Sequence, residues 1–180
     1  MCWSADVSAA FAVAEWAGLA WLWRRDAALD RPFAIALAPI AAQEALQWLL
    51  WEHVAVDHHV CDRVNVIASL LVRLVIGVVP LAWVWFARRG APASRLGRGL
   101  WAATVGYVAL SSAMVGYAFV VAPRSCTTTG PNHHQAWAGY LTHYQSLQPA
   151  LDVVYVTLYW SLPVAALLGC LRPRWLAWAI

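Results

Sequence analysis

The sequence predicts an all-α membrane protein, a polytopic bundle of five transmembrane helices with its N-terminus outside and a short interfacial helix in the loop between the fourth and fifth spans. Three observations predict this fold. Apolar residues make up 62% of the 180 residues and charged residues only 12%, whereas soluble domains carry about 25% charged residues. Five segments are long and apolar enough to cross a bilayer. The arginines are distributed unevenly among the loops that join these segments.

The composition also excludes several classes of protein. A water-soluble monomer of this size could not bury so much apolar surface, so lipid must cover it. A cytosolic enzyme, a secreted disulfide scaffold and a disordered tail are therefore excluded. The net charge is only +3 and the chain has no lysine, which does not fit a nucleic-acid-binding protein. The partners that the sequence predicts are the lipid bilayer and other membrane subunits.

Each predicted span meets the length of about 20 apolar residues that a bilayer core requires. The whole chain, residues 1–180, forms one membrane domain with an outer loop at 122–150. The five spans cover residues 3–23, 32–51, 64–86, 100–121 and 151–171. The first span is not a cleavable signal peptide, because Arg24 and Arg25 follow it instead of preceding it.

The arginine count predicts the orientation of the bundle. Nine arginines lie in the first and third loops and the C-terminal segment, whereas the second and fourth loops hold only Arg63 and Arg124. The nine are Arg24, Arg25, Arg31, Arg88, Arg89, Arg95, Arg98, Arg172 and Arg174. By the positive-inside rule, the N-terminus lies outside and the C-terminus in the cytoplasm of a multi-pass inner (plasma) membrane protein. Tryptophans near the span ends, such as Trp51 and Trp101, are typical of an interfacial belt.

Small residues in the fourth span predict close helix packing. Ala102 and Gly106, and likewise Ser112 and Gly116, stand four residues apart. Pairs of small residues at this spacing let two helix backbones approach each other. We therefore expect a neighbouring helix to pack on this face.

The outer loop at 122–150 predicts a turn followed by a short helix. Thr127–Pro131 has the composition of a turn, and Asn132 suits a helix N-cap. Beyond it, an apolar stripe at three- and four-residue spacing indicates an amphipathic helix in the outer interface. The stripe consists of Trp137, Tyr140, Leu141, Tyr144 and Leu147. This helix either packs on the ends of the spans or forms a lid over a site.

Ionisable side chains at membrane depth mark a site, a pathway or a structural ion pair. Three such groups are present, Glu15, Glu44 and Arg73. Arginine keeps its charge and needs a carboxylate as its partner. Judged by depth in the bilayer, Glu44 is the first candidate for the partner of Arg73 and Glu15 is the second. The expected buried polar network consists of Glu15, Gln43, Glu44, Gln47, Asn65, Arg73, Asp152 and Tyr155. A register-fixing pair and a proton relay or ligand cavity require the same inward-facing groups, so both hypotheses stay open.

All six histidines and three of the four cysteines fall on the predicted outer side. An oxidising compartment allows disulfides; a bridge between Cys61 and Cys126 is the first choice, with either one paired to Cys2 as the alternatives. Zinc or copper would suit the remaining donors, although no CxxC or HxxxH spacing is present. The candidate metal ligands are His53, His58, His59, His133, His134 and Cys2. A bis-histidine haem in mid-membrane is not expected, because only His53 stands near a span.

Several short motifs give the chain a resemblance to a known group. It begins Met1-Cys2-Trp3-Ser4, carries Glu44-Ala45-Leu46-Gln47, and has Asn65 and Pro80 fifteen residues apart. The outer loop holds Cys126, Gly130, His134 and Trp137 in the order C…G…HxxW. In these features the chain resembles small bacterial membrane proteins that begin with MCWS and are catalogued as a domain of unknown function. The third span departs from that group, with Val75 and Val79 where histidine and glutamine are expected. The resemblance implies a polytopic membrane fold in which these residues converge beneath the outer loop.

Three hypotheses for function follow, in this order. The first is a non-enzymatic accessory or partner-binding subunit of a membrane complex, because the chain shows no catalytic motif. The second is a copper, zinc or iron site, metal-binding or redox, at the outer face. The third is a transporter or a membrane-embedded enzyme that uses the buried glutamates and arginine.

Overall fold

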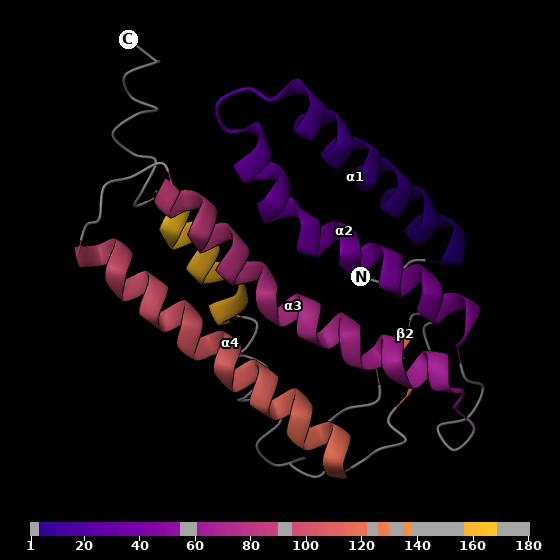
Figure 1. Ribbon diagram of the computed structural model, residues 1–180. Coiled ribbons are helices and arrows are strands. Elements are labelled where there is room, and N and C mark those ends of the chain that lie inside the picture. Colours follow the sequence, from indigo (N-terminus) through magenta and orange to yellow (C-terminus); the bar gives the residue numbers. More distant parts are fainter. Residues whose placement is uncertain are drawn as a thin grey trace.

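The computed structural model describes residues 4–54, 61–89, 95–121, 126–129, 135–137 and 157–168. These residues form five helices and one short hairpin (Figure 1). The four long helices are α1 (Ala5–Arg25), α2 (Asp30–Glu52), α3 (Arg63–Arg89) and α4 (Arg95–Val121), and a further helix covers Thr157–Leu168. The hairpin pairs β1 (Thr127–Thr129) with β2 (Gln135–Trp137). The prediction of an almost wholly helical chain is confirmed.

Sequence neighbours pack side by side, α1 on α2, α2 on α3, and α3 on α4. Consecutive helices run in opposite directions, so the row has two distinct ends (Figure 1). The helix at Thr157–Leu168 packs against α3 and α4, where Leu162 and Ala166 share a buried cluster with Val84, Ala87 and Tyr107. We call the end where α2 ends and α3 begins the hairpin end, because β1 and β2 lie there. The opposite end, where α1 and α3 end, is called the arginine end.

Three helices in the described part of the chain are long and apolar enough to cross a membrane. They are Asp30–Glu52, Arg63–Arg89 and the Gly97–Tyr117 part of α4. Large apolar side chains on their outer faces are exposed, among them Leu110 at 60% and Ile67 at 54%. Lipid would cover such surface, as expected for a membrane protein.

α1 is capped by Ser4 at its start, and charged side chains fix the turn that joins its end to α2. The Ser4 hydroxyl accepts a hydrogen bond from the Val7 amide at 3.3 Å and caps α1. At the other end, Asp26 adopts a left-handed conformation with φ 53°, which aspartate tolerates better than most residues. The Arg25 guanidinium donates to both carboxylate oxygens of Asp30, with Nε 2.6 Å from Oδ2. This pairing holds the two helices antiparallel.

The predicted turn and helix in the outer loop are wrong for the part that the structure describes. Thr127–Thr129 is a strand rather than a turn, and Gln135–Trp137, expected to lead into the helix, is its antiparallel partner. Three consecutive β-branched threonines favour an extended backbone, and tertiary hydrogen bonds hold that backbone in place. The rest of the expected helix, with Tyr140, lies outside the described residues.

The small residues of α4 do not form the predicted contact among the described helices. A Cβ atom added at Gly106 or Gly116 would meet nothing within 4 Å. α3 and α4 approach each other closely at a different face of α4, where a Cβ atom added at Gly77 of α3 would stand 2.7 Å from the Ser111 Oγ. The glycine that α3–α4 packing requires is therefore on α3, because the buried side of α4 carries Ser111.

Candidate functional site

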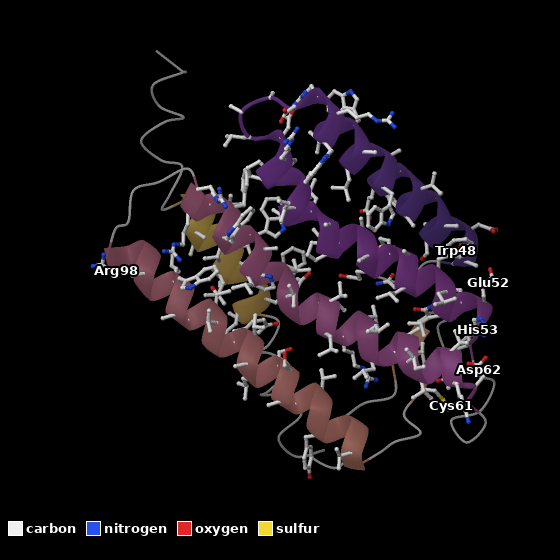
Figure 2. All side chains as sticks on the ribbon, viewed as in Figure 1. Trp48, Glu52, His53, Cys61, Asp62 and Arg98 are labelled. Carbon is white, nitrogen blue, oxygen red and sulfur yellow. A yellow bond between two sulfur atoms is a disulfide. The ribbon has the colours of Figure 1, made fainter. Side chains whose placement is uncertain are left out.

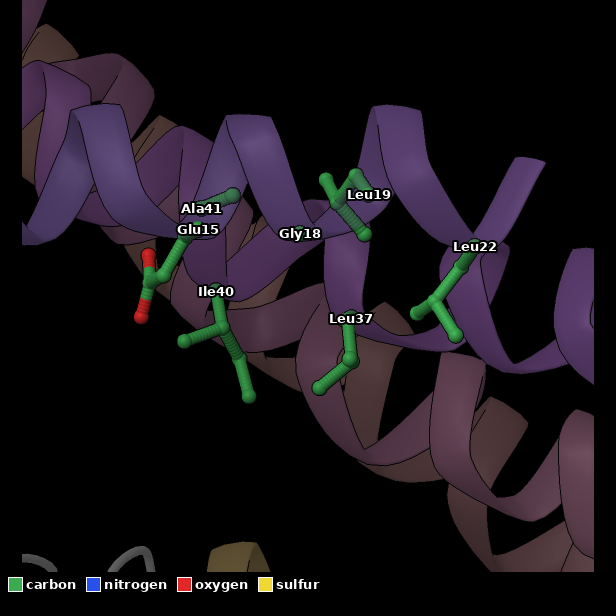
Figure 3. A pocket seen from close by; sticks show the side chains of 7 residues that line it. All are labelled: Glu15, Gly18, Leu19, Leu22, Leu37, Ile40 and Ala41. Carbon is green, nitrogen blue, oxygen red and sulfur yellow. The ribbon is translucent and has the colours of Figure 1, made fainter. Parts of the chain in front are cut away.

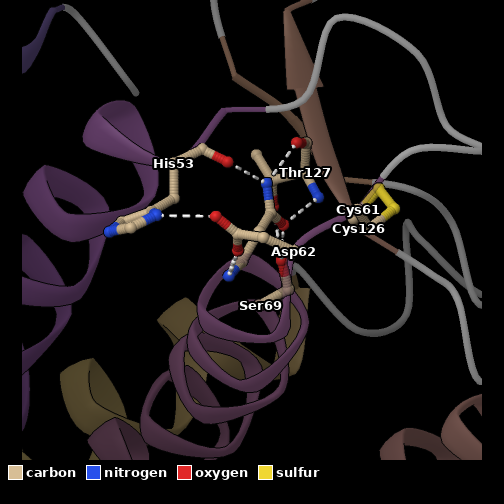
Figure 4. Close-up of a disulfide and its surroundings, with 7 residues drawn as sticks. His53, Cys61, Asp62, Ser69, Cys126 and Thr127 are labelled. Carbon is tan, nitrogen blue, oxygen red and sulfur yellow. Dashed lines mark hydrogen bonds and ion pairs between the residues drawn. A yellow bond between two sulfur atoms is a disulfide. The ribbon is translucent and has the colours of Figure 1, made fainter.

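Asn65 is the centre of a buried hydrogen-bond network at the hairpin end, and its partners His53, Ser69 and Thr127 are labelled in Figure 4. Its side chain is fully buried in the first turn of α3. The amide nitrogen donates to the backbone carbonyls of His53 at 2.7 Å and Thr127 at 2.8 Å. The amide oxygen accepts from the Thr127 backbone N–H at 2.8 Å and the Ser69 hydroxyl at 3.0 Å. An asparagine side chain has two donors and two acceptor positions, so every one of them is used.

The Asn65 amide replaces a neighbouring strand for β1. It both donates to and accepts from the backbone of Thr127, as an adjacent strand would. The Ser69 hydroxyl, one helical turn further along α3, lies 2.8 Å from the Thr127 hydroxyl and completes the contact. The predicted site residue Asn65 therefore joins three segments that are far apart in sequence.

Asp62 caps α3 and binds His53. Its Oδ1 accepts from the Asn65 backbone N–H at 2.6 Å, and its Oδ2 lies 2.7 Å from the His53 Nδ1. The hydrogen bond from the Asn65 N–H, followed by that from His53, lowers the pKa of Asp62 below its ordinary value. The ionised carboxylate is thus the form that holds the end of α2 to the start of α3.

The predicted disulfide between Cys61 and Cys126 is confirmed. The two Cα atoms are 5.9 Å apart, a separation usual for disulfides, and the bridge spans 65 residues of sequence. It joins the residue before Asp62 to the residue before Thr127. The covalent bond and the Asn65 network therefore fasten the same two segments, as Figure 4 shows.

A second hydrogen bond connects the hairpin to α2. The buried Gln135 side chain of β2 donates from Nε2 to the Gln47 backbone carbonyl at 2.9 Å. The Gln47 side chain is itself fully buried, yet neither its Oε1 nor its Nε2 has a partner among the described residues. The end of α2, the start of α3 and both strands thus meet at the hairpin end, where the Gln47 amide has no partner among the described residues.

Most of the predicted metal ligands lie outside the described residues. Of that set, only His53 lies within the described residues, and its Nδ1 contacts Asp62 (Figure 2). His58, His59, His133, His134 and Cys2 lie outside them. Within the part of the chain that the structure describes, no three histidine, cysteine or acidic side chains stand close enough to hold a metal ion. Cys61 and Cys126 are bonded to each other, which removes two thiolates from any metal set.

The predicted membrane-depth network is only partly assembled. Glu15 and Glu44 lie close enough for their charges to interact. Arg73 is 8% exposed on α3 and has contacts of its own, but the ion pairs among described residues join it to neither glutamate. Asp152 and Tyr155 lie outside the described residues, and Gln43 is half-buried on α2.

At the arginine end, the guanidinium groups lie over tryptophan rings. Arg25 stacks on Trp21 with its Cζ 4.2 Å from the ring centroid, and Arg89 on Trp85 at 4.7 Å. Arg31 with Trp23 and Arg88 with Trp101 make two further pairs. Such cation–π pairs suit an interface where one side is apolar and the other carries anionic groups.

The sequence interpretation did not identify Asp62, Thr127 or Gln135. Asp62 could have been found, because it stands immediately before α3 and three residues before Asn65, the spacing of an N-cap. Thr127 and Gln135 form hydrogen bonds with residues that are distant in sequence, and no local sequence pattern predicts such contacts.

Comparison of the chain with protein-family models, with curated proteins and with solved structures finds no match.

Proposed function

We propose that the chain crosses the membrane five times, with its N-terminus outside and its C-terminus in the cytoplasm. Two independent features support this orientation. A disulfide at the hairpin end is stable in an oxidising compartment, which is the outer side of a plasma membrane. The arginine–tryptophan pairs lie at the opposite end, the side on which the positive-inside rule places arginine.

We further propose that the protein is a non-enzymatic accessory subunit of a membrane complex. One observation carries this proposal. At the hairpin end, the described groups that could do chemistry are already engaged in holding the chain together: His53 with Asp62, Cys61 with Cys126, and Ser69 with Thr127. A site built for catalysis keeps its reactive groups directed at a substrate. These groups instead join the end of α2, the start of α3 and β1 to one another, which favours a docking or scaffolding surface.

We also propose membership of the group of MCWS membrane proteins. The support is that three residues of its motifs, Gln47, Asn65 and Cys126, belong to the same end of the bundle. Cys2, Trp3 and His134 lie outside the described residues. The resemblance names a fold and leaves the activity to be measured.

Reporter fusions test the orientation. Fused after Ile180, green fluorescent protein should fluoresce and alkaline phosphatase should be inactive, because the C-terminus is cytoplasmic. The same reporters placed in the segment between α2 and α3 should give the opposite pattern. Phosphatase activity at the C-terminus would overturn the proposed orientation.

Native-level expression tests the accessory role. The chain carries a tag at its own locus, membranes are cross-linked before solubilisation, and the complexes are separated and weighed. We expect one larger species with a fixed stoichiometry of a second membrane protein. A double variant of Cys61 and Cys126 to serine, in which the hairpin is released, should lose that species. Recovery of the wild-type chain alone as a monomer would overturn the proposal.

A further inference from the structure

A slot between α1 and α2 is apolar along its length and acidic at one end. It has a volume of about 140 Å³ and is lined by Glu15, Gly18, Leu19, Leu22, Leu37, Ile40 and Ala41 (Figure 3). Glu15, Leu19 and Leu22 follow one another along one side of α1, so the acidic end and the far apolar end are about 10 Å apart. In Figure 3 the Glu15 carboxyl group stands at one end of the row of lining side chains and Leu22 at the other.

The carboxyl group at the head of the slot lacks a partner. The Glu15 Oε2 is buried and has no hydrogen-bond partner among the described residues. None of the described ion pairs includes Glu15. Glu44, on the facing helix, adds a second negative charge nearby. A carboxylate at membrane depth is costly unless a cation or a donor neutralises it, and no described residue forms an ion pair with Glu15 or donates to its Oε2.

We propose that this slot is a binding site for a small organic ammonium with an apolar body. The ammonium group donates to the Glu15 carboxylate, and the hydrocarbon part lies along Leu19, Leu22 and Leu37. The charge of the ligand complements the acidic end, and its apolar part complements the leucines that line the remainder. This site is separate from the hairpin end and does not depend on the accessory role.

The volume limits the size of the ligand. An apolar protein cavity of about 150 Å³ binds benzene, so a slot of about 140 Å³ admits one ring or a short branched chain. A benzylammonium ion has a body of this size and one ammonium group. Gly18 contributes to the space because it has no side chain, and a Cβ added there would meet nothing within 4 Å.

Calorimetric titration of the detergent-purified full chain with benzylammonium tests the proposal. We expect saturable binding of one ion per chain. Benzyl alcohol, which has the same body but no charge, should bind at least about tenfold more weakly, because a charged hydrogen bond contributes roughly 1.5–3 kcal/mol. Equal binding of the two probes would show an apolar slot that takes any hydrocarbon, including a lipid chain, and would overturn the assignment.

Two variants address the two ends of the slot separately. Glu15→Gln removes the charge and should weaken benzylammonium binding at least about tenfold, while leaving benzyl alcohol unchanged. Gly18→Leu fills the slot without touching the carboxylate and should abolish binding of both probes. The matched controls are Glu52→Gln, which alters an exposed glutamate at the end of α2 that does not line the slot, and Gly116→Leu, which alters a helical glycine with equally open surroundings on α4.

Both controls should retain more than half of the wild-type affinity for benzylammonium. Thermal unfolding of each variant verifies that it is folded. Wild-type affinity in Glu15→Gln or in a folded Gly18→Leu variant would overturn the proposal, as would the absence of saturable binding to the wild-type protein. If Glu15→Gln fails to fold, the Gly18→Leu result decides.

Discussion

Two buried side-chain amides in this molecule have opposite surroundings. Asn65 on α3 uses both of its donors and both of its acceptor positions, whereas Gln47 on α2 uses neither its oxygen nor its nitrogen among the described residues. Both are fully buried. A satisfied buried amide holds segments together, while an unsatisfied one retains its full desolvation penalty. The same chemical group is therefore structural in one place and destabilising in the other.

The contrast extends to the regions around the two amides. Around Asn65, the start of α3 and β1 are joined by the hydrogen-bond network, a disulfide and a helix cap, so the polar groups there are engaged in structure. Gln47 and Trp51 on α2, and Glu15 in the slot beside α2, instead contain buried atoms that have no partner among the described residues. Structure explains the first set, and a ligand or ordered water would explain the second. This difference is why the binding proposal concerns the α1–α2 slot and not the histidine-rich end.

Replacing Asn65 should have the largest effect. Asn65→Leu keeps the shape of the side chain but leaves Thr127 N–H and two backbone carbonyls without partners. At about 1–3 kcal/mol for each of these three buried groups, we expect a loss of at least about 3 kcal/mol in the free energy of unfolding. Chemical or thermal unfolding in detergent measures it. A loss below about 1 kcal/mol would mean that the network is not structural.

Removing the disulfide should have the next largest effect. Changing Cys61 and Cys126 to serine together releases a constraint on 65 residues of sequence, and a bridge of that length stabilises a protein by about 2–4 kcal/mol. The wild-type protein should lose stability by a similar amount in reductant, whereas the double variant should be insensitive to it. Identical unfolding of wild type with and without reductant, under conditions that break the bridge, would contradict this account.

Acid should weaken the hairpin end by a smaller amount. Asp62 has a lowered pKa in the folded chain; its contribution to stability is therefore present above its unfolded pKa of about 4 and is lost as the pH falls through the still lower folded value. Asp62→Asn keeps a capping side chain and should change stability at pH 7 by less than about 1 kcal/mol. Comparing the two proteins between pH 6 and pH 3 should show less acid destabilisation in the variant. Parallel pH profiles would mean that Asp62 does not supply this dependence.

Much of the fold follows from local sequence. Apolar runs of bilayer length predicted all five helices, and the spans at 32–51 and 64–86 lie within α2 and α3. The loops that contain Cys61 and Cys126 also predict their pairing, which the structure contains. The helices and the pairing are predictable because the length and polarity of each segment are local properties of the sequence.

The hairpin and the partners of the polar groups could not be predicted in the same way. The spacing of Trp137 suggested a helix, but the strand at Gln135–Trp137 is stabilised by β1, and β1 in turn by Asn65, 62 residues away. The depth estimate put Arg73 level with Glu44, yet depth does not define which face of a helix a side chain occupies. Tertiary contacts decided both outcomes, and single-sequence periodicity does not contain them.

Gln47→Met, measured beside Asn65→Leu, tests the central comparison most directly. Both variants replace a buried amide with an apolar side chain of similar shape. Because the Gln47 amide has no partner to lose among the described residues, its replacement should leave the free energy of unfolding unchanged or raise it by up to about 2 kcal/mol, while Asn65→Leu lowers it. The account predicts that Asn65→Leu has a lower free energy of unfolding than wild type and that Gln47→Met does not, with the two variants separated by at least about 3 kcal/mol. Equal destabilisation by both substitutions would contradict it.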